Sequence, residues 1–231
     1  MPQKRVLLTG ATGFIGRQCV PALLSEGCEV HAVSRSTPAE PTVPSPIWHE
    51  ADLRDYHAIA TLLEQVRPTH LLHLAWFTKH MEMYTHHENI HWVGDSLNLF
   101  HSFIRSGGRR MVVAGSCAEY DWSTGVCDEQ TTPMNPASLY GSCKHAAHLC
   151  LAALARQNNI SYAWARMFYI YGPHDTNPRI VPSVIRSILA GQVAKCSPGN
   201  QSADFLHVRD VASALIALLQ SDVRGAINIA T

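Results

Sequence analysis

A tyrosine and a lysine lie four residues apart in the segment LYGSCKHAAH, which runs from Leu139 to His148. Four residues is slightly more than one helical turn, so Tyr140 and Lys144 would share one face of a helix. An ammonium beside a phenol favours the ionised phenol, which is a way of doing acid–base chemistry. The pair also occurs by chance, so its meaning depends on the elements around it.

A glycine-rich segment near the start of the chain has the features of a phosphate-binding turn. In TGATGFIGR, Gly10, Gly13 and Gly16 are spaced three apart, between an apolar run and a helical pattern. Such glycines allow a tight turn and a close approach of the backbone to pyrophosphate, whose charge the helix N-terminus stabilises. The segment predicts a dinucleotide-binding turn, and the alternative is an ordinary glycine-rich connection.

The end of the second predicted strand bears on which dinucleotide would bind. An acid there binds the free 2′-hydroxyl of the adenosine ribose, whereas an arginine suits a 2′-phosphate. This chain has Ser34 and Arg35 at that place and no acid, which favours NADP(H) over NAD(H). The alternative is that Arg35 is a solvated loop residue. Asp52 would follow a further crossover, where its carboxylate could meet the adenine amino group.

The elements that would position these residues alternate between strand and helix. Strands are predicted at 5–9, 28–34, 69–75, 109–116, 161–168 and 225–231, and helices at 14–26, 56–66, 89–105, 137–156, 182–190 and 210–220. The proline-rich segment Thr37–Pro46 is predicted to be a loop. This alternation predicts an α/β fold with a parallel, doubly wound Rossmann sheet covered on both faces.

The regular alternation of strands and helices changes after Tyr171, which suggests that the chain divides there into two structural parts. Residues 1–170 are expected to form the dinucleotide-binding domain. Residues 171–231 are expected to supply a small substrate lobe, interleaved with the last elements of the Rossmann domain.

Composition excludes several other classes of protein. Lys plus Arg equals Asp plus Glu at 18 each, so there is no electrostatic footprint for nucleic acid. No apolar run approaches a membrane span, and the first one ends at Gly10, too early for a secretory signal. Seven cysteines without a Cys-x-x-Cys pair argue against disulfide scaffolds and zinc ribbons, and a cytoplasmic location is expected. His87 and His91 have the spacing of a metal clip, but no third ligand supports it, so no metal is expected.

Together, the motifs resemble those of the extended short-chain dehydrogenases/reductases. More narrowly, they are similar to the NAD(P)-dependent nucleotide-sugar epimerases, dehydratases and ketoreductases. The similarity covers almost the whole chain. It rests on eight segments that occur in order: TGATGFIG, DLRD, HLAW, GSCAEY, YGSCK, RMFYIYGP, ADFLHVRDVA and GAINIAT. Because this family commonly continues well past the place where Thr231 follows an apolar strand, the C-terminal lobe is expected to be incomplete.

This resemblance implies a catalytic triad of Ser116, Tyr140 and Lys144. Tyr140 would exchange a proton with a sugar oxygen while hydride moves to or from the nicotinamide. Lys144 would hold the nicotinamide ribose and favour the tyrosinate, and Ser116 would hydrogen-bond the reacting oxygen. The residues expected to contact the cofactor are Gly10, Thr12, Gly13, Phe14, Ile15, Gly16, Ser34, Arg35, Asp52, Leu53, Leu74, Ala75, Trp76, Tyr140 and Lys144.

The chain departs from the sugar 4,6-dehydratases directly after the triad serine. In those enzymes an Asp and a Glu at this place eliminate water. This chain has Cys117 and Ala118 there, and Glu119 lies one position too far along. Dehydration by that route is therefore not expected.

Two further departures concern the substrate. Tyr169 stands where the family often has an asparagine, and Ala203 stands where an arginine usually grips the diphosphate. Arg179 or Arg209 could replace that arginine. The candidate substrate-binding residues are therefore Cys117, Tyr169, Arg179 and Arg209.

Three functions remain open at this stage. The first is NADPH-dependent reduction of the 4-keto sugar of a nucleotide-sugar. The second is C4 epimerisation of a nucleotide-sugar with tightly held NAD, and the third is non-catalytic dinucleotide binding. A homodimer is also expected, because the helices at 89–105 and 137–156 carry more apolar positions than one sheet face needs. The resemblance implies that these two helices pair about a two-fold axis.

Overall fold

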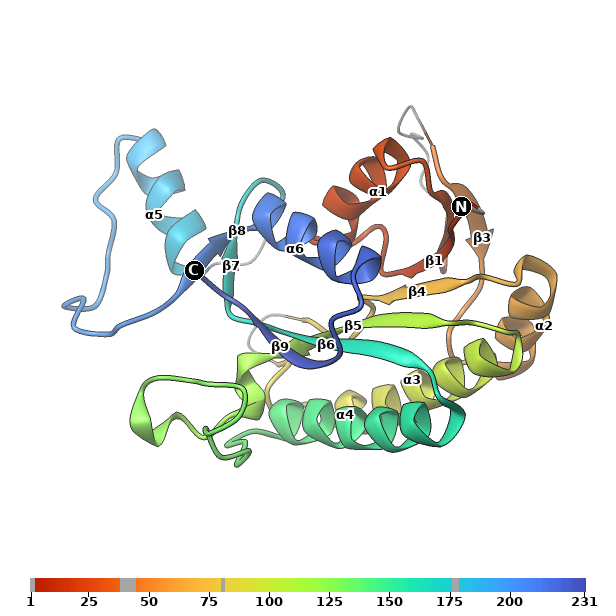
Figure 1. Cartoon of the computed structure of the whole chain (residues 1–231). Helices are drawn as coiled ribbons and strands as arrows, with labels where there is room; N and C mark the ends of the chain where they lie inside the picture. The colour runs from red at the N-terminus through yellow and green to blue at the C-terminus, as the bar shows by residue number, and fades with distance from the viewer. Residues whose placement is uncertain (1–2, 38–44, 80–81, 176–178) are drawn as a thin grey trace.

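The protein folds around one parallel sheet of seven strands. The computed structural model describes residues 3–37, 45–79, 82–175 and 179–231. The strand order is β3-β2-β1-β4-β5-β6-β9, with every neighbouring pair parallel (Figure 1). The strands are β1 (Arg5–Thr9), β2 (Glu29–Ser34), β3 (Ile47–Glu50), β4 (His70–His73), β5 (Arg110–Ser116), β6 (Ser161–Met167) and β9 (Gly225–Ile229).

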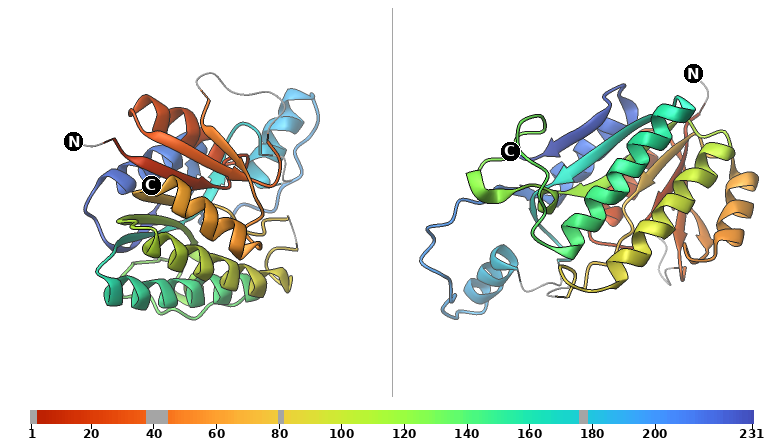
Figure 2. Two further views of the ribbon diagram at one scale, coloured as in Figure 1. Left: turned by 90° about the vertical axis from the view of Figure 1, so that its right-hand side faces the viewer. Right: turned by 90° about the horizontal axis from the view of Figure 1, so that it is seen from below.

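Helices cover both faces of this sheet (Figures 1 and 2). One face carries α1 (Gly16–Ser25) and α6 (Val208–Gln220), and the other carries α2 (Tyr56–Val66), α3 (Glu88–Arg105) and α4 (Leu139–Asn158). Successive strand residues point to opposite faces, so Val6 and Leu8 join the core under α1 and α6, while Leu7 joins the other core. Burial on both faces explains why the strands are apolar almost throughout.

A smaller part of the chain lies outside this sheet. Strands β7 (Tyr169–Tyr171) and β8 (Phe205–His207) form a separate two-stranded parallel sheet. Helix α5 (Ile180–Leu189) stands apart from the main layers in Figure 1, and only Pro182 among its residues is buried. Two short 3₁₀ turns, η1 (Cys117–Glu119) and η2 (Trp122–Thr124), follow β5. None of the described helices is long and apolar enough to cross a membrane.

The doubly wound α/β fold expected from the sequence is confirmed, and the predicted helices and strands end within a few residues of the observed ones. The helix expected from residue 14 begins at Gly16, because the preceding residues belong to the glycine turn. Strands β3, β7 and β8 were not predicted. They have only three or four residues each, too few for a periodic pattern. Most of the predicted loop Thr37–Pro46 lies outside the described residues.

Candidate active site

The glycine turn connects β1 to α1 and leaves no room for side chains. Gly10 has a φ of 73°, and a Cβ there would lie 2.9 Å from the Ala75 nitrogen. A Cβ on Gly16 would lie 2.1 Å from the Gly10 oxygen, and the Gly13 N–H donates to that oxygen at 3.0 Å. Because these glycines have no side chains, the phosphates of a dinucleotide could approach the backbone closely at the start of the helix.

A cavity of about 360 Å³ adjoins this turn. Its lining residues are Thr12, Gly13, Phe14, Arg17, Thr78, His174 and Asp175. The Arg17 guanidinium donates to the Thr12 carbonyl at 3.1 Å, which places a positive charge beside the turn. Phe14 and Ile15, also expected to contact the cofactor, are half-buried against the core beneath α1 and α6.

A buried hydrogen-bond chain holds the carboxyl ends of β1 and β4 together. The Thr9 hydroxyl lies 2.7 Å from His73 Nδ1, and His73 Nε2 lies 3.0 Å from the Ser96 hydroxyl. Ala75 N donates to Thr9 Oγ1 at 3.3 Å. Burial, together with the charge of Lys144, lowers the pKa of His73 to about 3, so this imidazole is neutral. These hydrogen bonds fix the segment that contains Leu74 and Ala75 beside the glycine turn.

The residues expected to read the adenosine lie at the carboxyl ends of β2 and β3. Ser34 ends β2 and is half-buried, while Arg35 is exposed and forms no hydrogen bond or ion pair with the described parts of the chain. Asp52 is exposed and accepts a hydrogen bond at 3.0 Å from the Arg54 backbone N–H. Leu53 packs against the core beneath α2, α3 and α4.

Ser116 and Tyr140 meet between β5 and α4. Ser116 ends β5, and its Oγ accepts a hydrogen bond from Ala118 N at 3.1 Å. Tyr140 lies in the first turn of α4 and is buried. Burial raises the pKa of Tyr140 well above its usual value, although a hydrogen bond from the Ser116 side chain opposes this shift. The phenol is therefore protonated near neutral pH.

Lys144 lies one turn further along α4 and is 2% exposed. Its Nζ donates to the Ala114 carbonyl at 2.8 Å and lies 3.7 Å from the centroid of the Trp76 ring. It lies 6.0 Å from the Tyr140 ring centroid. Burial lowers the pKa of Lys144 to about 7, while the charge of Glu119 acts against that shift. The structure thus brings all three predicted triad residues to one place.

The Trp76 ring is itself held in position by a residue that the sequence did not single out. Trp76 Nε1 donates to Asn89 Oδ1 at 2.9 Å. The Asn89 amide nitrogen donates to the carbonyls of Met83 and His86 at 2.7 and 2.8 Å. Asn89 is fully buried at the start of α3. An isolated asparagine in a helical pattern carries no sequence signal of this role.

Two of the four candidate substrate residues lie close to the triad. Cys117 is 8% exposed within η1, and burial raises the pKa of its thiol to about 12. Tyr169 is exposed on β7, where its ring centroid lies 5.7 Å from that of Phe205. Burial of its hydroxyl and the charge of Cys117 both raise the pKa of Tyr169, which indicates that the two side chains are neighbours.

The two candidate arginines are placed differently. Arg179 immediately precedes α5; its Nη1 lies 3.8 Å from Asp175 Oδ2 and donates to the Ile170 carbonyl at 3.5 Å. Arg209 is exposed in the first turn of α6. Ala203 is exposed as well. Within the described ranges, no hydrogen bond or ion pair joins either arginine to the triad.

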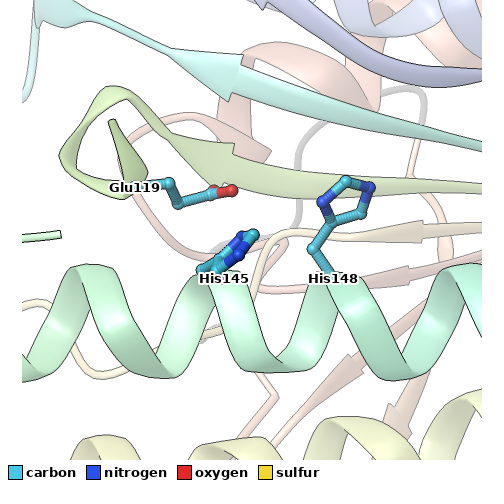
Figure 3. A group of neighbouring side chains, drawn as sticks. All are labelled: Glu119, His145 and His148. Atoms are coloured by element: carbon cyan, nitrogen blue, oxygen red, sulfur yellow. The ribbon is translucent and has the colours of Figure 1, made fainter. Parts of the chain in front are cut away.

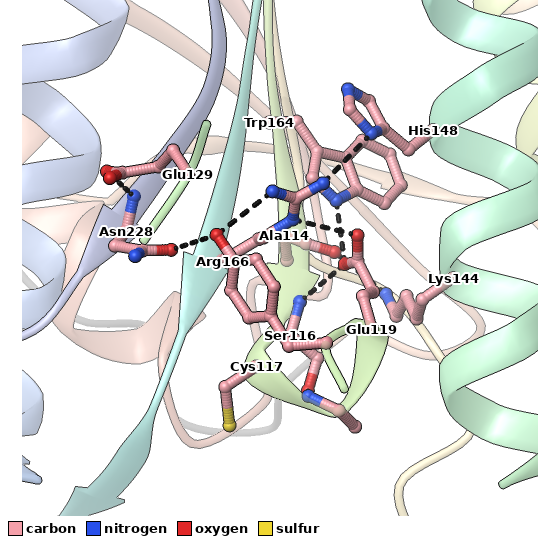
Figure 4. Close-up of polar contacts among 12 residues, drawn as sticks. Ala114, Ser116, Cys117, Glu119, Glu129, Lys144, His148, Trp164, Arg166 and Asn228 are labelled. Atoms are coloured by element: carbon pink, nitrogen blue, oxygen red, sulfur yellow. Dashed lines mark hydrogen bonds and ion pairs between the residues drawn. The ribbon is translucent and has the colours of Figure 1, made fainter. Parts of the chain in front are cut away.

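A buried ion pair lies beneath the triad, and Figure 4 shows it. Glu119 is fully buried. Its Oε1 accepts hydrogen bonds from Ser116 N and Trp164 Nε1, both at 2.8 Å, and its Oε2 lies 3.1 Å from Arg166 Nε. Sequence reasoning treated Glu119 only as a displaced dehydratase acid, because its partners lie on β6, far along the chain.

Glu119 also belongs to the only group of three metal-ligand side chains within the described residues (Figure 3). His145 and His148 complete that group, with ligand atoms within 4.8 Å of one another. However, Arg166 Nη2 lies 3.5 Å from His148 Nδ1 as well as pairing with Glu119. The guanidinium charge would repel a cation at this place, so we assign no metal to the cluster.

The fold and the glycine turn are those of a dinucleotide-binding protein. The chain belongs to the NAD dependent epimerase/dehydratase family, whose model matches residues 6–230. The resemblance drawn from the eight sequence segments is thereby confirmed.

Individual relatives have different reactions in their names. The chain is 27% identical to UDP-glucuronic acid decarboxylase 1 of Xenopus tropicalis, over 98% of this chain and 56% of that protein. It is 25% identical to dTDP-6-deoxy-L-talose 4-dehydrogenase (NAD(+)) of Aggregatibacter actinomycetemcomitans, over 96% and 83% of the two chains. The crystal structure of UDP-glucose 4-epimerase from Thermus thermophilus in complex with NAD superimposes with a TM-score of 0.82 at 26% identity, over 98% and 78%. This chain thus spans just over half the length of the curated decarboxylase.

Proposed function

We propose that the protein catalyses the NADPH-dependent reduction of the 4-keto sugar of a nucleotide-sugar. The observation that carries this choice is the end of β2, where Ser34 and Arg35 replace an acid and Arg35 is exposed and without a described partner. Arg35 offers a planar, permanently charged donor to a 2′-phosphate. A reductase must exchange its cofactor in every cycle, and cellular reducing power is carried mainly as NADPH.

In this proposal the triad handles the proton. The dinucleotide, when bound, supplies the hydride to C4. Tyr140 holds a proton at its phenol oxygen, because burial keeps its pKa high, and passes it to the developing C4 oxygen. Ser116 hydrogen-bonds that oxygen and fixes its position, and Lys144 favours the tyrosinate that remains.

Dehydration is not part of the proposal. Cys117 and Ala118 offer no carboxylic acid after the triad serine. Both oxygens of Glu119 are already engaged by Ser116, Trp164 and Arg166. Neither chemistry nor geometry therefore supports the loss of water from the sugar.

The proposed substrate is a nucleotide-sugar, as in the names of the relatives. Cys117 and Tyr169 are the proposed sugar contacts, since they lie beside the triad. We propose Arg179 or Arg209 for the diphosphate, with residues 171–231 contributing the substrate lobe and residues 1–170 the dinucleotide domain. Seven free cysteines suit the cytoplasm as the proposed location.

The alternative within the family is a C4 epimerase that keeps NAD bound. The Thermus epimerase, whose structure contains NAD, gives this alternative its support. A non-catalytic dinucleotide-binding protein is the third possibility. The presence of Ser116, Tyr140 and Lys144 in one place counts against it.

Equilibrium titration with NADPH and NADH tests the proposal. Charge-assisted contacts to the 2′-phosphate should favour NADPH by about 1.5–3 kcal/mol, roughly ten- to hundred-fold. The double substitution Ser34→Asp with Arg35→Ala should reverse this preference. Arg156→Ala, an exposed arginine at the end of α4, is the matched control and should leave the preference unchanged.

Equal affinities, or NAD⁺ that co-purifies and does not dialyse out, would remove the support for the reductase. The epimerase would then be the better assignment. Consumption of NADPH on addition of a 4-keto nucleotide-sugar, followed by absorbance, is the direct assay. No consumption with any such sugar, despite tight NADPH binding, would favour the non-catalytic alternative.

A further inference from the structure

We propose that Glu119 is a positioning residue for the triad. It would act through the hydrogen bond that it accepts from the Ser116 backbone N–H and through its own buried charge. The inference rests on the proposed roles of Ser116, Tyr140 and Lys144. It assigns to Glu119 neither the water elimination performed by dehydratase acids nor a metal. Three independent features of the structure lead to it.

The first feature is the hydrogen-bond pattern of η1. The Glu119 side chain reaches back to the Ser116 N–H at 2.8 Å, while Ser116 Oγ accepts from Ala118 N at 3.1 Å. These reciprocal bonds form a capping box. They fix the Ser116 hydroxyl oxygen and leave its O–H free to donate. The position of that O–H beside Tyr140 therefore depends on Glu119.

The second feature is the anchoring of the carboxylate itself. Trp164 and Arg166 lie two residues apart on β6, so both reach the same side of the sheet. A Cβ on Gly115 would lie 2.3 Å from Trp164 Nε1 and 2.9 Å from Glu119 Oε1. Only glycine at 115 permits this arrangement. The carboxylate is thus locked by groups that are themselves rigid.

The anchoring continues to the edge of the sheet (Figure 4). Arg166 Nη1 donates to the Tyr120 hydroxyl at 3.0 Å, and that hydroxyl donates to Asn228 Oδ1 at 2.7 Å. Asn228 N in turn donates to Glu129 Oε1 at 2.8 Å. The network is buried at Glu119 and Arg166 and becomes exposed at Glu129, and its connected hydrogen bonds hold the buried members in one geometry.

The third feature is charge. The titratable groups facing Glu119 are Arg166 from β6, Cys117 from η1, and Tyr140, Lys144, His145 and His148 from α4. The negative charge of Glu119 raises the pKa of Lys144 and of Tyr140. It thus keeps the proton on the proposed donor and opposes the loss of the lysine charge caused by burial.

The test uses the ionisation of Lys144, which needs neither substrate nor turnover. The chain has four lysines, Lys4, Lys79, Lys144 and Lys195, so NMR of ¹³Cε-labelled lysine can follow each one, with Lys144→Met to assign the signal. Glu119→Gln keeps an oxygen acceptor for Ser116 and Trp164 but removes the charge. It should lower the Lys144 titration midpoint by about one pH unit. Glu119→Gln with Arg166→Gln, which removes both charges, should lower it as well, because Glu119 is the charged group that acts on Lys144.

Glu129→Gln is the matched control, because it makes the same change elsewhere in the network. It should leave the Lys144 midpoint in place. A folded Glu119→Gln protein with an unchanged midpoint would overturn the electrostatic part of the inference, and so would a midpoint that rises toward that of an exposed lysine. The double variant keeps the test valid if the single one, with Arg166 unpaired, does not fold.

Turnover supplies the second readout, which separates positioning of Ser116 from a general loss of structure. The charge-neutral double variant should lower kcat at least about tenfold with KM within about twofold. Most of this loss should disappear when it is measured in a Ser116→Ala background. An equal loss in both backgrounds would overturn the role through Ser116. Failure of the reductase assay in the wild type would count against the proposed function alone, since the lysine titration still stands.

Discussion

Burial acts in opposite directions on the two titratable side chains of the triad. It raises the pKa of the Tyr140 phenol and lowers the pKa of the Lys144 ammonium to about 7. Both shifts favour the neutral form, as expected in a low-dielectric site. Without cofactor the pair is therefore mostly uncharged above about pH 7.

Replacing Tyr140 with Phe should keep the fold and the affinity for the dinucleotide but lower turnover by about 10²–10⁴-fold, since a positioned proton donor is lost. Ser116→Ala should be less severe, because Tyr140 can still give its proton. Tyr56→Phe in α2 is the control, because it removes a phenol that donates to Asp95 at 2.9 Å rather than one beside Ser116, and turnover should stay near normal. Near-normal turnover of Tyr140→Phe on the true substrate would rule out this acid–base role.

The lowered pKa of Lys144 also predicts a pH dependence of stability. Between about pH 7 and the unfolded pKa near 10.5, the unfolded chain binds the proton that the folded chain has lost, so this group makes stability rise with pH. Above about pH 8.5 the buried thiols and Tyr140, whose pKa values are raised, act the other way.

Urea unfolding of the cofactor-free protein between about pH 7 and 8.5 checks this prediction. The wild-type midpoint should rise relative to that of Lys144→Met. The exposed Lys195 provides the control, and Lys195→Met should behave as wild type. Parallel pH profiles for wild type and Lys144→Met would show that the ammonium is not desolvated in the folded state.

At the level of elements, the site depends on how closely α4 approaches η1. A Cβ on Gly141 would lie 2.1 Å from the Ala118 carbonyl oxygen. This close contact sets the distance between Ser116 and Tyr140, which lie on either side of it. Glycine is unfavourable inside a helix, so the close approach is the physical reason for it here.

Gly141→Ala should therefore destabilise the protein by about 1–3 kcal/mol, the usual cost of overpacking, although alanine favours helix formation. It should also reduce turnover, because α4 must move away from η1. Denaturant unfolding and the reductase assay would measure the two effects. Gly94→Ala in α3 is the matched control, because a Cβ there would meet only the Tyr56 hydroxyl at 3.9 Å, and it should not destabilise the protein. A stabilised Gly141→Ala protein would contradict the contact.

Elements with a clear hydrophobic pattern could be predicted from the sequence, whereas strands that form only by pairing with another strand could not. β1 reads as an apolar run before glycine, but β3 exists because Ile47–Glu50 pairs with β2 at the sheet edge. The proximity of Ser116, Tyr140 and Lys144 could be expected from spacing and resemblance. The partners of Glu119 could not, because Trp164 and Arg166 are 45 and 47 residues away and arrive through strand pairing.

For the molecule as a whole, we propose that α3 and α4 form a homodimer interface. The two helices lie side by side on one face of the protein (Figure 2). The exposed positions in the first four turns of α4 carry no charge and are Ser142, Ala146, Leu149, Cys150 and Ala153. Ile90 on α3 is 54% exposed and Leu149 is 56% exposed. Such an uncharged surface suits a second copy of the chain.

Light scattering at micromolar concentration should therefore give twice the chain mass of 25.5 kDa. Leu149→Glu should shift the protein toward monomer, because it places a charge in the apolar interface. Val223→Glu, at an exposed position between α6 and β9, should leave the assembly intact. A monomeric wild type would exclude this interface.

The hydrogen bond from Tyr120 to Asn228 joins residues that are 108 positions apart. During translation, the ribosome releases the glycine turn and the whole of α4 well before β9. A nascent chain therefore contains Ser116, Tyr140 and Lys144 early, whereas the hydrogen-bond network that includes Asn228 is completed only when β9 emerges and pairs with β6. The three side chains and the complete hydrogen-bond network around them are therefore formed at different times during synthesis of the polypeptide.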